Sequence, residues 1–131
     1  MALRSSLNGI GIMQGSRVMA FATATFLLAV TLYYGVIFQG QLPDHPMLRG
    51  QNDLFLHFIA FLALTLPVGL LFPRWPYYSA LASFAAVIEA IQIFQPDRNA
   101  DFNDFIAGFL GVLLGAALIA IIQRILEPNH E

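Results

Sequence analysis

The chain has 131 residues, of which 58% are hydrophobic and 11% are charged, and its net charge is −2. A soluble domain of this size would carry about a quarter charged residues. The apolar residues stand in long blocks, which predicts a one-domain, multi-pass membrane protein. The six basic residues are scattered arginines, which excludes the clustered basic face of a nucleic-acid-binding protein. The absence of cysteine excludes disulfides, thiolate nucleophiles and Cys-based zinc sites.

Residues 1–17 are mixed in character, and we expect them to form a cytoplasmic N-terminal segment. Residues 18–38 are apolar for about the 20 residues that a spanning helix requires, which predicts a first transmembrane helix. This stretch is too long for the apolar core of a signal peptide, and no small-x-small cleavage motif follows it. We therefore expect the helix to be retained.

A polar loop follows at residues 39–52, where prolines and glycine predict irregular backbone. The second predicted helix covers residues 54–72. It contains Pro67, which membrane helices tolerate when neighbouring groups satisfy the freed carbonyl. A tight turn follows at residues 73–76, and Trp75, Tyr77 and Tyr78 beside Arg74 form a group typical of an anchor at the membrane surface.

The third predicted helix covers residues 77–94, and a polar run then leads to Asp104. The fourth covers residues 105–126, and residues 127–131 form a polar tail. The expected fold class is an all-α membrane protein with a four-helix transmembrane domain at residues 18–126.

The arginines predict the orientation of these helices. Four of them fall on one side of the membrane and two on the other: Arg4, Arg17, Arg74 and Arg124 against Arg49 and Arg98. The positive-inside rule makes the first side cytoplasmic. Both termini are then expected in the cytoplasm, with the protein in the inner or plasma membrane.

This topology brings polar residues from distant parts of the sequence to one depth at the outer face. Asp53 and His57 would lie in the first turns of the second helix, at a spacing that shares one helix face. Glu89 and Gln92 would share a face in the last turns of the third helix. Asp104 would stand just before the fourth helix. An ionisable residue such as Glu89 is costly in an apolar segment, which indicates a polar site here.

A stripe of glycines follows on the fourth helix, at Gly108, Gly111 and Gly115. Small residues let helix backbones approach each other in lipid, where packing drives association. We expect these glycines to serve ordinary helix packing and to hold the polar groups above them in place.

The ordered set of motifs resembles the VanZ-like family of small bacterial membrane proteins. The motifs are Asp53 before His57-Phe58, Glu89-x-x-Gln92, Pro96-x-Arg98 and Asp104-x-x-x-Gly108-x-x-Gly111. The resemblance covers residues 53–115 and implies a role in the cell envelope, since the family is named for a protein associated with low-level teicoplanin resistance. Two positions depart from the family pattern, namely Leu54 in place of a frequent Lys and Gly108 in place of a common Asn.

Seven polar residues form the candidate site, two with catalytic and five with substrate-binding roles. The catalytic pair is Glu89 and His57, and the binding residues are Arg98, Gln92, Asp53, Asp101 and Asp104. Glu89 with His57 would act as a general acid or base, and Arg98 would hold an anionic head group. The alternatives are a structural clasp formed by Arg98, and a Glu89 carboxylate that His57 or Arg98 simply neutralises.

A metal site is a weaker alternative at the same place. Imidazole and carboxylates suit zinc, so His57 could bind a metal ion beside Glu89, Asp53 or Asp104. Only His57 among the histidines is well placed, so neither a metal nor another cofactor is predicted. We expect His57 to hydrogen-bond to a carboxylate, which would set its tautomer.

Three functions are compatible with these features. The sequence does not decide whether the protein is an enzyme. The favoured one is a cell-envelope protein that binds or modifies an anionic lipid-linked or glycopeptide-type amphiphile at the outer leaflet, in a role like teicoplanin resistance. The second is a small proton-coupled transporter, although no internal repeat of the kind common in transporters is visible. The third is a structural or accessory membrane subunit. The lipid bilayer is the expected partner, and assembly into a homo-oligomer is left open.

Overall fold

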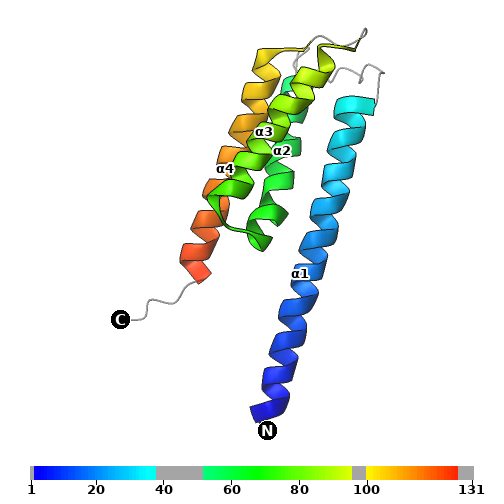
Figure 1. Cartoon of the computed structure of the whole chain (residues 1–131). Helices are drawn as coiled ribbons and strands as arrows, with labels where there is room; N and C mark the ends of the chain where they lie inside the picture. Colours follow the sequence, from blue (N-terminus) through cyan, green and yellow to red (C-terminus); the bar gives the residue numbers. More distant parts are fainter. Residues whose placement is uncertain (1, 38–51, 96–99, 127–131) are drawn as a thin grey trace.

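The computed structural model describes residues 2–37, 52–95 and 100–126 (Figure 1). Within these ranges the chain forms four α-helices and one π-helical segment, with no strands. The all-α fold class is therefore confirmed. Three helical stretches are long and apolar enough to cross a membrane, namely Gln14–Ile37, Asn52–Leu71 and Phe102–Leu126.

The first helix, α1, covers Ala2–Leu32 and continues as the π-helical segment η1 at Tyr33–Ile37. It begins ahead of the apolar stretch predicted at 18–38, and no proline interrupts these residues. The predicted N-terminal segment 1–17 is thus helical from Ala2 onward and continuous with the membrane stretch.

Helices α2 and α4 cover Asn52–Leu71 and Phe102–Leu126, close to the ranges predicted from hydropathy. Pro67 lies inside α2 and is buried, in keeping with the tolerance of membrane helices for proline. The helix α3 covers Trp75–Gln92 and has a proline at its first turn, where the fixed proline φ angle suits helix initiation.

Helix α3 is not among the three stretches whose hydropathy suits a membrane span. Its first turn holds Trp75 and two tyrosines, and its last turns hold Glu89 and Gln92, all of which lower its mean hydropathy. The prediction of four spanning helices is therefore supported for α1, α2 and α4.

The core lies between α2, α3 and α4, and its buried members are Phe61, Leu64, Leu81, Ala85, Ile88 and Val112. Helix α1 lies beside α2 on the outside of this three-helix group (Figure 1). Its described large apolar side chains are mostly exposed, as expected of a helix that faces lipid.

The closest helix pair is α2 with α4, and glycines make this approach possible. A Cβ atom at Gly111 would collide with the carbonyl oxygen of Phe58, and one at Gly115 would lie 2.7 Å from Cβ of Thr65. The prediction that these glycines serve helix packing is confirmed.

Because helices that follow one another in the chain run in opposite directions, one end of the bundle collects the starts of α2 and α4 with the ends of η1 and α3 (Figure 1). We call this end the polar end. It is the end at which the sequence predicted a site.

Candidate functional site

Three polar side chains from three helices meet at the polar end, and we call them the polar triad: His57 of α2, Glu89 of α3 and Asp104 of α4. Nδ1 of His57 lies 3.3 Å from Oε1 of Glu89. Their metal-ligating atoms all lie within 4.8 Å of one another. Glu89 and Asp104 are each 8% exposed, so both carboxylates are removed from solvent.

The register of the three helices brings the polar triad together. Phe61, Ala85 and Gly108 each lie one helical turn from a triad member, toward the middle of the bundle. A Cβ atom at Gly108 would stand 2.9 Å from Cδ2 of Phe61 and 3.3 Å from Cβ of Ala85. The three helices therefore touch in an apolar layer directly beneath the polar triad, and this contact determines which polar residues meet above it.

The helix ends affect the two triad carboxylates in opposite ways. Asp104 lies in the first turn of α4, where the helix dipole stabilises a negative charge. Glu89 lies near the last turn of α3, where the dipole opposes one. The imidazole of His57 faces Glu89, and when protonated it forms an ion pair with that carboxylate.

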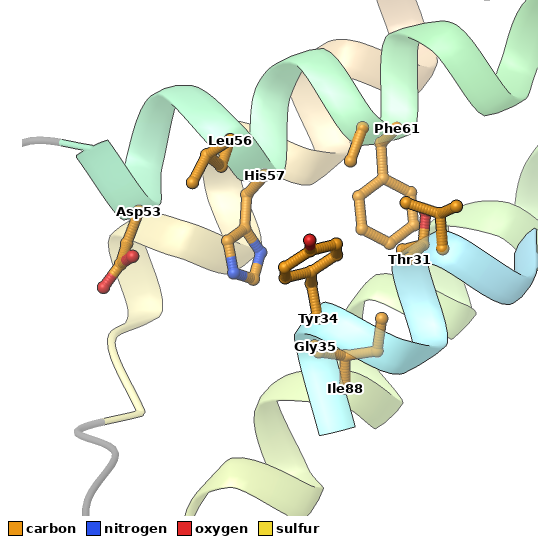
Figure 2. Close-up of a pocket in the computed structure, with 10 residues that line it drawn as sticks. Thr31, Tyr34, Gly35, Asp53, Leu56, His57, Phe61 and Ile88 are labelled. Carbon is orange, nitrogen blue, oxygen red and sulfur yellow. The ribbon is translucent and has the colours of Figure 1, made fainter. Parts of the chain in front are cut away.

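A pocket of about 290 Å³ lies beside the polar triad, between the end of α1 with η1, α2 and α3 (Figure 2). Its wall is mostly apolar and includes Ala60, Phe61 and Ile88. His57 belongs both to the wall and to the polar triad, and Figure 2 shows its imidazole beside the ring of Tyr34. The polar lining residues are Thr31, Tyr34, Asp53 and His57, and of these only His57 also belongs to the polar triad.

Gln92, the last residue of α3, and Gln95, three residues further along the chain, tie the end of the first helix to the bundle. Nε2 of Gln92 donates to the carbonyl oxygen of Gly35 at 2.8 Å, and Nε2 of Gln95 donates to that of Val36. The last carbonyls of a helix lack partners within it, so the side chains of Gln92 and Gln95 cap the end of η1. Gln92, predicted to bind substrate, lies buried in this cap.

Asp53 and Asp101 are predicted binding residues that do not belong to the polar triad. Asp53 is exposed on α2 and lines the pocket one turn before His57. Asp101 is exposed, and its Oδ1 accepts hydrogen bonds at 2.9 Å from the backbone N–H and the side-chain amide of Asn103. Asp101 thus caps the start of α4, which is a local structural task. Arg98 lies outside the described residues.

Sequence reasoning missed three contributors to this site, namely Tyr34, Gly35 and Gln95. Tyr34 and Gly35 fall in an apolar stretch that looks uniform in hydropathy. A tyrosine near the end of a predicted spanning helix was the one available signal, because such residues mark the interface region.

The polar triad has two chemical capacities. A proton can be shared between imidazole and carboxylate across 3.3 Å, or the nitrogen and carboxylate oxygens can coordinate a metal ion. An all-helical fold with three helices able to cross a bilayer, and a buried polar cluster at one end, defines an integral membrane protein.

The chain belongs to the VanZ/LLP1 family, whose sequence model matches residues 12–123. The resemblance seen in the motifs is thereby confirmed, and the match extends it from α2 back into α1. No curated protein and no solved structure matches the chain significantly.

Proposed function

We propose that this VanZ/LLP1 protein binds a cell-envelope amphiphile, with an apolar segment of the ligand in the pocket and its polar part at the His57 end. The observation that carries the proposal is a pocket of about 290 Å³ with mostly apolar walls and with His57 and Asp53 together at one end (Figure 2). This volume stands at the lower limit of small-ligand sites, about 300 Å³. It suits part of an alkyl chain rather than a whole lipid.

We also propose that α3 is the fourth transmembrane helix. Its 18 residues span about 27 Å, close to the hydrocarbon thickness of about 30 Å. Glu89 and Gln92 are buried against neighbouring helices, which removes their cost in lipid. Four spans place both termini on one side, and the arginines make that side the cytoplasm of an inner or plasma membrane.

The finer parts of the proposal concern the head group. Glu89 and His57 would exchange a proton with the ligand, which their 3.3 Å separation supports. Arg98 would bind an anionic group of a lipid-linked precursor or glycopeptide-type amphiphile, as its place in the family motif suggests. Resistance to glycopeptides such as teicoplanin is the physiological form of this proposal.

A cross-linking experiment tests the site. The full chain in mild detergent is exposed to phosphatidylglycerol with a photoreactive acyl chain, and labelled peptides are mapped by mass spectrometry. We expect labels on residues of the pocket wall and a loss of these labels in Ala60→Phe, because the larger side chain fills the pocket.

Ala120→Phe is the matched control, since Ala120 is exposed on α4 away from the pocket. It should leave the labels unchanged. Equal labelling of the pocket wall in both variants and the wild type would contradict the proposal, because the label would then report general lipid contact.

The charge of the head group is tested separately. Photoreactive phosphatidylethanolamine replaces phosphatidylglycerol, and Arg98→Ala is compared with Arg124→Ala at the other end of the chain. If Arg98 binds an anionic group, Arg98→Ala alone reduces phosphatidylglycerol labelling. Equal labelling by both lipids in all variants would leave the pocket as the binding site and would contradict the binding of an anionic head group.

A further inference from the structure

The polar triad combines one imidazole and two carboxylates supplied by three different helices. Their ligating atoms lie within 4.8 Å of one another, so a single ion can reach all three after small side-chain movements. Imidazole nitrogen and carboxylate oxygen are both ligands of zinc. We propose that His57, Glu89 and Asp104 bind a divalent transition-metal ion, with Zn²⁺ as the best match.

The charge of the polar triad supports this proposal. Two carboxylates that are each 8% exposed repel one another when both are ionised. A divalent cation with two carboxylates and a neutral imidazole has no net charge, which is the favourable state in a low-dielectric environment. Arg74 precedes the first turn of α3 and Arg124 lies in the last turn of α4, so both stand at the end of the bundle opposite the polar end.

The polar triad is also held rigidly, as a metal site requires. The contact of Gly108 with Phe61 and Ala85 lies one turn beneath the three ligands and sets the spacing of their helices. Side chains on packed helices hold a metal geometry more closely than side chains on loops.

The donor set indicates the class of ion. Mixed nitrogen and oxygen donors suit Zn²⁺ and, less well, Mn²⁺, whereas an oxygen-only set would suit Mg²⁺ or Ca²⁺. Three protein ligands leave one position of a tetrahedral ion open, as in zinc sites that bind water or substrate. His57 lines the pocket, so the ion would border it and would take the place of the proton shared by His57 and Glu89. Metal binding requires only the polar triad and does not rest on amphiphile binding.

The test measures metal binding to the full chain in mild detergent after removal of metal with EDTA. Titration calorimetry with ZnCl₂, MnCl₂ and MgCl₂ is run on the wild type, Glu89→Gln, Asp104→Asn and Asp101→Asn. The last variant makes the same chemical change at an exposed carboxylate close to the polar triad in sequence.

We expect one equivalent of Zn²⁺ to bind the wild type and Asp101→Asn, more tightly than Mn²⁺, with no binding of Mg²⁺. Glu89→Gln and Asp104→Asn should weaken Zn²⁺ binding at least about 100-fold, since loss of a direct ligand exceeds the effect of an outer-shell change. Zn²⁺ should raise the midpoint of thermal unfolding of the wild type. It should leave the midpoints of Glu89→Gln and Asp104→Asn unchanged.

The proposal is overturned if the wild type takes up no Zn²⁺, or if the triad variants bind it as tightly as the wild type. Should a triad variant fail to fold, X-ray absorption at the zinc edge of the wild type still decides the matter. One imidazole with oxygen ligands is expected there, and a zinc shell without imidazole would overturn the assignment.

Discussion

Gln92 of α3 donates a hydrogen bond of 2.8 Å from Nε2 to the carbonyl oxygen of Gly35 in η1. Gln92 is 1% exposed, and Gly35 approaches Ile88 so closely that an added Cβ would lie 3.1 Å from its Cγ2. The bond joins the outermost helix to the core at the polar end, and it closes one side of the pocket that Gly35 lines.

Gln92→Leu should destabilise the protein by about 1–3 kcal/mol, because the Gly35 carbonyl loses this buried donor. Thermal unfolding in detergent measures the effect. Gln14→Leu makes the same change at an exposed position of α1 and should have little effect. Equal midpoints for the two variants would show that the bond to Gly35 contributes nothing measurable.

Gly111→Ala should destabilise the protein by about 1–3 kcal/mol, since the added methyl group meets the backbone of Phe58 and Leu62, which cannot turn aside as a side chain can. Gly15→Ala is the control, because nothing lies within 4 Å of a Cβ there. It should be neutral or stabilising by up to about 1 kcal/mol through helix propensity. A Gly111→Ala protein as stable as the wild type would refute this close approach of α2 and α4.

Asp101→Ala should cost about 1 kcal/mol of stability through loss of the cap of α4. Asp101→Asn keeps a side-chain oxygen that can accept the hydrogen bond from the N–H of Asn103, so it should retain most of the stability. Chemical denaturation distinguishes the two variants. If Asp101 serves only as a charged binding residue, both variants would be as stable as the wild type.

Whether α3 crosses the membrane can be tested with single cysteines, because the natural chain has no cysteine. Arg74→Cys and Asn99→Cys place one thiol on each side of α3 in sequence. An impermeant maleimide applied to intact cells should label Asn99→Cys alone, and Arg74→Cys only after the membrane is opened. Labelling of both thiols from the outside would exclude α3 as a transmembrane helix in the proposed orientation.

Three of the four helices, and the end of the bundle at which polar residues collect, were predictable from the amino-acid sequence to within a few residues, whereas α1 begins at Ala2 instead of residue 18. The predicted helices at 54–72 and 105–126 lie within a few residues of α2 and α4, because long apolar runs bounded by polar and proline-containing segments form helices regardless of their neighbours. The alternation of helix direction then placed His57, Glu89 and Asp104 at one end.

The sequence could not predict which of the candidate residues meet, because that depends on packing between helices. In the folded protein His57, Glu89 and Asp104 meet. Asp101 instead caps α4, and Gln92 donates a hydrogen bond to the carbonyl oxygen of Gly35. Tyr34 lines the pocket. The physical reason is that helix register depends on contacts across helices, here Gly108 against Phe61 and Ala85. Hydropathy describes each helix alone, and it carries no information about such contacts.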